Sequence, residues 1–189
     1  VTVSHYRLSI HLTIAFIIIS IIFWVLINFK RETNKFFFNI SQKHLPFIIL
    51  IFLIFLQIIF GAFVSGLDAG KIYQTWPMMG NSFFPNDLKI SRINDLIDFN
   101  SHSLVQFYHR LLAYIISLYV LILSFMIIKF RIKRLYSPIL LLGIFIIIQI
   151  LLGIFTLISG LNIYVASAHQ ISSVILVLSS INLYYFYVK

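Results

Sequence analysis

The clearest pattern along the chain is an alternation between long apolar runs and short polar connections. Crossing a bilayer as a helix takes roughly 20 apolar residues. Five runs reach that length, with boundaries near 8–29, 45–67, 104–130, 138–160 and 163–186. The pattern therefore predicts an all-α integral membrane protein with five transmembrane helices, held in the lipid bilayer.

The composition supports a membrane protein and excludes several function classes. Of 189 residues, 61% are hydrophobic and only 10% are charged, a balance that no soluble domain of this size needs. The net charge of +9 sits in short connections between spans, so it indicates membrane topology rather than nucleic-acid binding. The absence of cysteine excludes disulfides, thiolate ligation of haem and iron–sulfur clusters.

The charged residues also predict an orientation. The connections at 31–44 and 129–134 are strongly basic, whereas the long connection at 68–103 is mixed and the turn at 160–162 is uncharged. The positive-inside rule places the two basic connections in the cytoplasm or its organellar equivalent. The N-terminus and the other two connections are then outside, and Lys189 is inside.

Three histidines, His11, His109 and His169, lie near the predicted outer starts of three different spans. An ionisable residue inside a span is costly and commonly functional, and imidazole is a usual axial ligand of haem iron. Small residues follow the faces of His109 (Ala113, Ser117) and His169 (Ala166, Ser172, Ser173). They predict a slot beside each imidazole that a porphyrin could occupy; the alternative is simple close packing of helices.

A short internal repeat groups the last four spans into two hairpins. Gln57 and Gly61 in one span, and Gln149 and Gly153 in another, form the same Gln-x-x-x-Gly pattern. Each is followed by an outer connection and then by a span carrying a histidine. The repeat predicts a pseudo-twofold four-helix bundle around a haem. We interpret the two glutamines as interhelical hydrogen-bonding residues.

Several other polar residues leave alternatives open. Arg7, one turn from His11, is either a contact of a haem propionate or an interfacial arginine. Arg110 is suited to a propionate or to lipid headgroups. The segment 66–80, rich in glycine, proline and polar residues, suggests a cover over the mouth of the bundle. The remaining histidines lie in connections or at interfaces and are interpreted as incidental: His5, His44 and His102.

Four stretches make the chain resemble the haem A synthases, in their proteobacterial and mitochondrial branch. They are Tyr6-Arg-Leu-Ser-Ile-His-Leu, Gly66-Leu-Asp-Ala-Gly with Gln74-Thr-Trp-Pro-Met, Leu104-Val-Gln-Phe-Tyr-His-Arg, and Ala168-His-Gln. They occur in the right order and extend over nearly the whole chain. The lack of cysteine fits this branch, since the other branch carries a cysteine pair in an outer loop.

The resemblance implies a fold of eight spans in two halves. Residues 1–30 would supply the last helix of the N-terminal half, 31–44 a cytoplasmic loop, and 45–189 the complete C-terminal half with its outer loop 68–103. His109 and His169 match the axial pair of a haem b cofactor. His11 matches one of two histidines on the side of the substrate haem, the other lying on a helix outside this sequence. We therefore expect the chain, which begins at Val1, to be part of a longer protein.

The resemblance also implies a reaction and partners. The family oxidises the C8 methyl group of haem O to the formyl group of haem A, the cofactor of terminal cytochrome oxidases. The enzyme that produces haem O and the cytochrome oxidase assembly machinery are the implied partners, and the bacterial plasma membrane or mitochondrial inner membrane is the implied location.

Two other functions compete with a haem-modifying enzyme. A bis-histidine cytochrome b electron carrier would use the same histidine pair, but it gives no role to His11 or to the segment 68–79. A transporter or channel would use the histidines as proton relays and would favour acidic residues inside the spans. All five acidic residues lie in connections instead: Glu32, Asp68, Asp87, Asp95 and Asp98.

Overall fold

A computed structural model describes residues 4–37, 41–88 and 92–188. Its main elements are five helices: α1 (His5–Lys30), α2 (Leu45–Gly66), α3 (His102–Lys129), α4 (Tyr136–Ile158) and α5 (Ile163–Tyr187). Three short 3-10 turns lie between them: η1 (Ala69–Lys71), η2 (Ile93–Ile97) and η3 (Lys133–Leu135). Within those described ranges there is no β-strand, only an isolated bridge between Met79 and Ser82.

All five helices are long and apolar enough to cross a membrane, which confirms the predicted all-α membrane architecture. The predicted boundaries agree with the observed ones to within three residues. Two lysines used in the charge pattern, Lys89 and Lys189, lie outside the described residues.

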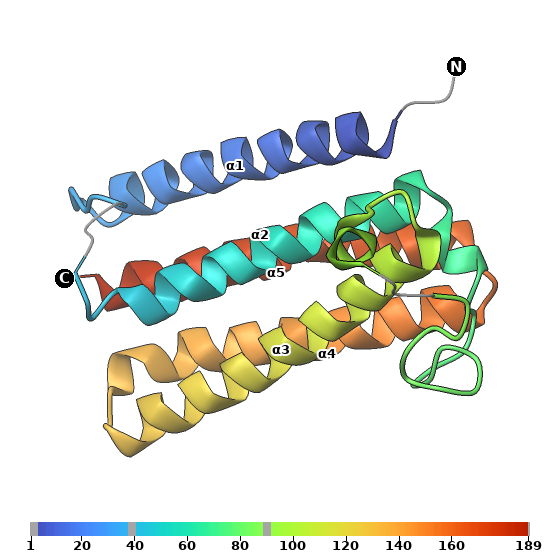
Figure 1. The fold of residues 1–189 in the computed structure, drawn as a ribbon. Coiled ribbons are helices and arrows are strands. Elements are labelled where there is room, and N and C mark those ends of the chain that lie inside the picture. The colour runs from blue at the N-terminus through green and yellow to red at the C-terminus, as the bar shows by residue number, and fades with distance from the viewer. Residues whose placement is uncertain (1–3, 38–40, 89–91, 189) are drawn as a thin grey trace.

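The last four helices form a ring in which each contacts its two neighbours. α2 packs on α3, α3 on α4, α4 on α5, and α5 on α2. α3 and α5 therefore stand at opposite corners of the ring. α1 lies outside it, alongside α2 and α5 (Figure 1). The four-helix arrangement agrees with the predicted bundle, whereas its pseudo-twofold symmetry remains a prediction.

The two ends of the bundle differ in chemistry. We call the end where α1, α3 and α5 begin the histidine end, because His11, His109 and His169 lie within the first turns of these helices. The opposite end, where α1 and α3 finish, is called the basic end. It carries eight of the twelve lysine and arginine residues that the structure describes: Lys30, Arg31, Lys35, Lys43, Lys129, Arg131, Lys133 and Arg134.

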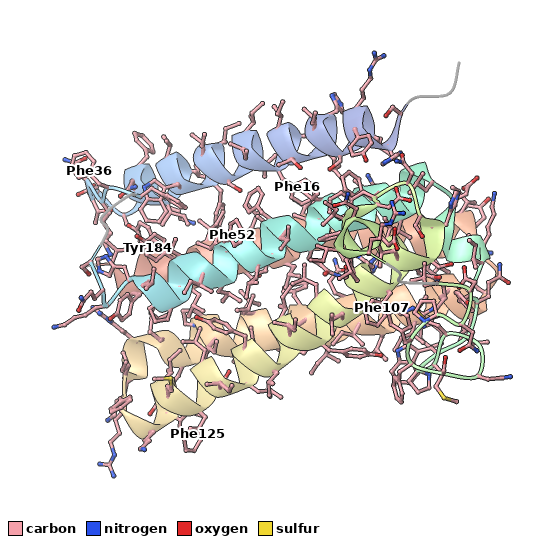
Figure 2. The ribbon with its side chains drawn as sticks, in the orientation of Figure 1. Phe16, Phe36, Phe52, Phe107, Phe125 and Tyr184 are labelled. Carbon is pink, nitrogen blue, oxygen red and sulfur yellow. The ribbon has the colours of Figure 1, made fainter. Side chains whose placement is uncertain are left out.

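Large apolar side chains cover the outward faces of the helices as well as the core. Phe16 of α1 is 3% exposed and lies between α1 and the ring, whereas Phe125 of α3 is 64% exposed and points away from the bundle (Figure 2). A helix that is apolar on all sides suits an environment of lipid on one face and protein on the other. The surface therefore fits the membrane interpretation.

The turn between α4 and α5 shows why glycine is needed there. Gly160 and Leu161 both adopt a positive φ, 69° and 63°, and Asn162 then caps α5 by accepting a hydrogen bond from the Tyr164 amide at 3.0 Å. The tight turn predicted at 160–162 is confirmed, and it places α4 and α5 side by side.

At the basic end an aromatic cluster ties α1 to α5. The Trp24 ring stacks on Tyr184 with centroids 5.7 Å apart, and its Nε1 donates to the Lys35 carbonyl at 3.0 Å. The Lys35 ammonium donates to the carbonyls of Tyr185 and Val188, at 3.1 and 2.5 Å. A cation at these carbonyls is favourable because the C-terminus of a helix carries partial negative charge. The segment after α1 is thus fixed to the end of α5.

We expect Trp24→Ala to detach α1 from the ring, because the cavity left at the cluster removes the packing and one hydrogen bond. The expected loss of stability is about 3 kcal/mol, measured by unfolding in mixed micelles. Phe29→Ala, on the same helix but at an 83% exposed position, is the matched control and should change stability by less than about 0.5 kcal/mol. Equal losses in the two variants would show that the cluster does not hold α1.

Candidate functional site

His109 and His169 lie on the two helices at opposite corners of the ring. His109 lies on α3 and His169 on α5, each within about two turns of the start of its helix. The predicted pairing of these two residues at one end of the bundle is therefore consistent with the arrangement of the helices.

Each imidazole rests on a glycine of the neighbouring helix. A Cβ atom added to Gly61 of α2 would lie 3.1 Å from Cε1 of His109, and one added to Gly153 of α4 would lie 3.2 Å from Cε1 of His169. Both distances are shorter than ordinary van der Waals contact. Any larger residue at either glycine would therefore push the ring away from its helix, so the glycines fix where the rings stand.

The two glutamines of the repeat also contact the histidine helices. Nε2 of Gln57 donates to the His109 carbonyl at 3.1 Å and lies 3.4 Å from Nε2 of the same histidine. Nε2 of Gln149 donates to the His169 carbonyl at 3.1 Å and to Ser172 Oγ at 3.0 Å. The interhelical hydrogen bonds expected of both glutamines are therefore present, and their partners are the residues of the candidate site.

The donor set suits a group that needs only two protein ligands. Nδ1 of His109 and Nδ1 of His169 are buried without a hydrogen-bond partner, which is unusual for a buried polar atom. A haem iron takes at most two protein ligands, because the porphyrin supplies its other ligands. The residues present therefore fit the predicted haem.

His11 and Arg7 are placed away from this pair. Both side chains are exposed on α1, whose buried positions, such as Ser9 and Phe16, face the ring. His5, interpreted from the sequence as incidental, is instead only 8% exposed and packs against Phe63 with ring centroids 5.3 Å apart. The structure thus separates His11 from the other two histidines.

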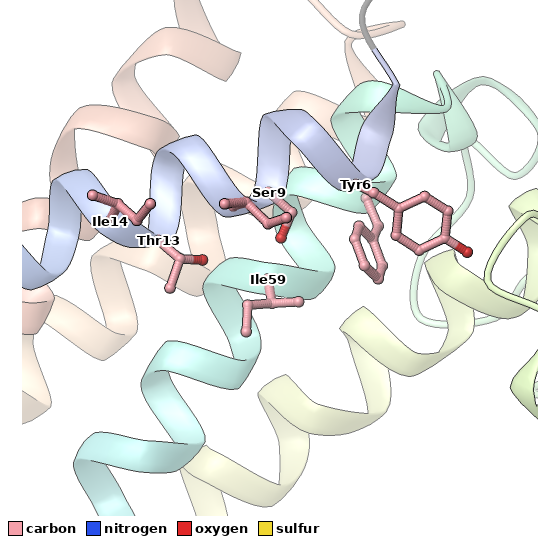
Figure 3. Close-up of a pocket in the computed structure, with 7 residues that line it drawn as sticks. Tyr6, Ser9, Thr13, Ile14 and Ile59 are labelled. Carbon is pink, nitrogen blue, oxygen red and sulfur yellow. The ribbon is translucent and has the colours of Figure 1, made fainter.

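A shallow groove of about 280 Å³ runs between α1 and α2 near the histidine end. Figure 3 shows Tyr6, Ser9, Thr13 and Ile14 of α1 facing Ile59 of α2 across it. Its lining is mostly apolar, and none of the predicted ligand histidines contributes to it.

Arg110 contacts the long connection between α2 and α3. Its Nη2 donates to the Tyr73 carbonyl at 2.9 Å, and its Nη1 donates to the carbonyls of Thr75 and Met78 at 2.9 and 3.3 Å. The predicted cover thus lies against α3 beside His109. The propionate and headgroup contacts suggested for Arg110 remain predictions.

A carboxylate anchors the same connection. Asp87 accepts hydrogen bonds from the Tyr73 hydroxyl at 2.5 Å and from Ser103 Oγ at 2.6 Å. Burial raises the pKa of Asp87, but the bonds from Ser103 and Tyr73 outweigh it and hold the pKa below its usual value. The bond to Asp87, together with burial, raises the pKa of Tyr73.

Comparison with known proteins gives the chain its family. The model of the cytochrome oxidase assembly protein family, COX15-CtaA, matches residues 1–181. The chain belongs to this family. It is 46% identical over 178 residues to the haem A synthase of Pelagibacter ubique, covering 94% of this chain and 51% of that protein. It is also 39% identical over 181 residues to the haem A synthase of Wolbachia pipientis, covering 95% of this chain and 50% of that protein.

The family assignment agrees with the resemblance found in the sequence. This family member spans about half the length of the curated relatives it matches. No solved structure matches it.

Sequence reasoning did not find every residue of the site in this family member. The Gln-x-x-x-Gly repeat was visible, but its contact with the histidines depends on how each helix is rotated about its axis. Little in the sequence indicated that His5 would be buried. Nothing in the sequence indicated the hydrogen bonds from Arg110 to the α2–α3 connection, because every residue has a backbone carbonyl and the sequence does not show which ones accept a bond.

The Asp87 contacts should make the connection sensitive to pH only at the extremes. A lowered pKa means that the contact stabilises above the ordinary carboxyl pKa of about 3.9 and is lost as pH falls below it. The raised pKa of Tyr73 means a second loss above about pH 10. Fluorescence of Trp76, in a Trp24→Phe background, should be flat between about pH 5 and 9 and change below about pH 4. A transition near pH 7, or an acid transition that survives Asp87→Asn, would contradict this.

Proposed function

We propose that the chain is the C-terminal part of a haem A synthase, in which His109 and His169 are the two axial ligands of a resident haem b. The observation that carries the proposal is the pair of imidazoles on opposite corners of the ring, each resting on a glycine. The names of the relatives support the same reading. Bound haem b would supply one-electron transfer away from the substrate.

The substrate in this proposal is haem O, whose C8 methyl group is oxidised in successive steps to the formyl group of haem A. His11 serves as a ligand of the substrate haem iron. Its exposed position on α1, away from the ring, supports a second site completed by residues outside this sequence. Residues 1–30 then belong to the other half of the enzyme, and residues 45–189 form the half that holds haem b.

The proposed location is the bacterial plasma membrane or the mitochondrial inner membrane, with the histidine end on the outer side. The cations at the basic end support this orientation by the positive-inside rule. The enzyme that makes haem O is the proposed partner upstream, and the cytochrome oxidase assembly machinery receives the product. A bis-histidine electron carrier is less well supported, since the relatives are named as synthases.

The first test is the binding of haem b to the purified chain. His109→Ala and His169→Ala should each abolish the six-coordinate low-spin absorption spectrum, because each removes one axial ligand. His102→Ala, an exposed position at the start of the same helix α3, should leave the spectrum unchanged. An unchanged low-spin spectrum in both ligand variants would sink the assignment.

The reaction is tested by joining the chain to the N-terminal half of the Pelagibacter ubique protein. The joined protein should convert haem O to haem A, identified by chromatography and mass. His11→Ala in it should abolish turnover while the haem b spectrum is retained. Retained turnover would remove His11 from the substrate site, and haem b binding without any turnover of haem O in the parent would favour the electron carrier.

The contacts of Gly61 and Gly153 with the two imidazoles give an independent prediction. Gly61→Ala and Gly153→Ala should each weaken haem b binding by about tenfold or more, because the new Cβ would lie 3.1 or 3.2 Å from an imidazole carbon. Gly143→Ala, on α4 with no atom within 4 Å of the added Cβ, is the matched control. If Gly143→Ala weakens haem b binding as much as Gly61→Ala and Gly153→Ala do, the proposed role of the two glycines in placing the imidazoles is contradicted.

A further inference from the structure

We infer that Arg110 is a positioning residue: its guanidinium gathers carbonyls of the α2–α3 connection and holds that segment as a cap across the histidine end of the bundle. The cap is defined here as residues 69–80. The effect of this cap on bound haem rests on the proposed function, whereas the clamp itself is a property of the chain alone.

The carbonyls of Tyr73, Thr75 and Met78 converge on the one guanidinium, at 2.9, 2.9 and 3.3 Å. Hydrogen bonds from a charged donor are stronger than neutral ones. The cap is also bonded within itself, since Thr75 Oγ1 donates to the Met78 carbonyl at 2.8 Å and accepts from the Gly80 amide at 2.9 Å. The guanidinium therefore holds a preformed turn rather than a loose strand.

Arg110 belongs to a row of anchors on α3. Ser103, Gln106 and Arg110 are spaced by three and four residues, which places them on one face of a helix. Ser103 donates to Asp87, and Nε2 of Gln106 donates to the Tyr73 carbonyl at 2.8 Å. The row lies along the first turns of α3, where His109 adjoins Arg110.

The cap also reaches the second hairpin. A Cβ atom added to Gly70 would lie 2.8 Å from Cδ2 of Leu161, so the backbone of η1 lies directly against the α4–α5 turn. Ala69 and Gly70 are buried accordingly. The cap therefore bridges the hairpin that carries His109 and the hairpin that carries His169, and Arg110 fixes its α3 side.

Arg110 could act on bound haem in two ways, and the contacts of the cap allow an experiment to distinguish them. In a propionate role the arginine acts directly on bound haem through its charge. In the clamp role it acts through the cap, whose closure keeps water from the edge of the site and so raises the reduction potential of the haem. Gln106 distinguishes the two, because it is uncharged and bonds to the cap but not to a ligand histidine.

The clamp is tested first without haem, by hydrogen exchange of the 189-residue chain in detergent. The probes are the Gly80 amide, which donates to Thr75 Oγ1 within the cap, and the Met79 amide, which donates to the Ser82 carbonyl just beyond it. Arg110→Ala and Arg110→Lys should each accelerate their exchange by on the order of tenfold, since lysine cannot reproduce the fork. Lys129→Ala, at the far end of α3, is the control and should have no effect. Unchanged exchange in Arg110→Ala overturns the clamp.

The second measurement is the reduction potential of bound haem b. Arg110→Lys and Gln106→Leu should both lower it, because both open the cap to water. A potential that shifts in the arginine variant but not in Gln106→Leu overturns the action through the cap and assigns the direct propionate role. If the unchanged chain binds no haem b, the proposed function fails, and the exchange measurement still decides the clamp.

Exchange of the α3 and α5 amides in the same experiment shows whether each variant is folded. If Arg110→Ala does not fold, Gln106→Leu carries the test. It should accelerate exchange at Met79 and Gly80 but leave α5 protected. The last variant combines Gln106→Leu with Arg110→Lys. If the Met79 and Gly80 amides remain protected from exchange in this double variant, the proposal is overturned.

Discussion

Two imidazoles can stand inside a helical bundle only if the helices behind them leave room. Gly61 and Gly153 provide that room, because a Cβ atom at either position would lie within 3.2 Å of a histidine ring carbon. The rest of the arrangement depends on this contact. It sets how closely α2 approaches α3 and α4 approaches α5, and it brings Gln57 and Gln149 onto the histidine carbonyls. The same local geometry therefore occurs twice, once in each hairpin.

The connection between α2 and α3 adds a constraint across the two hairpins. Arg110 and Gln106 hold it to α3, and Gly70 lies against Leu161 beyond α4. At the basic end, Trp24 and Tyr184 hold α1 to α5. The histidine end is thus fixed by polar bonds to backbone carbonyls, and the basic end by aromatic packing. α1 keeps an outward face that carries His11 and is free of contacts with the ring.

Most of the fold could be predicted from the sequence, because a membrane span needs a long apolar run and a tight turn needs a residue such as Gly160. The position of His109 and His169 near the starts of α3 and α5 could also be predicted, because both residues lie near the start of an apolar run. What could not be predicted depends on helix rotation and on backbone atoms. The burial of His5 on α1 and the convergence of three carbonyls on Arg110 belong to this second kind. The Gln-x-x-x-Gly repeat is an intermediate case: the repeat could be seen in the sequence, but the contacts of its residues with the histidines could not.

The most direct test of the account is an equilibrium titration of haem b into the purified chain, followed by absorption. The account predicts saturation at one haem per chain with a six-coordinate low-spin spectrum, because the proposed haem would be ligated by both imidazoles. Saturation with a five-coordinate high-spin spectrum would mean that only one histidine ligates. Either that result or the absence of saturable binding would contradict the central claim.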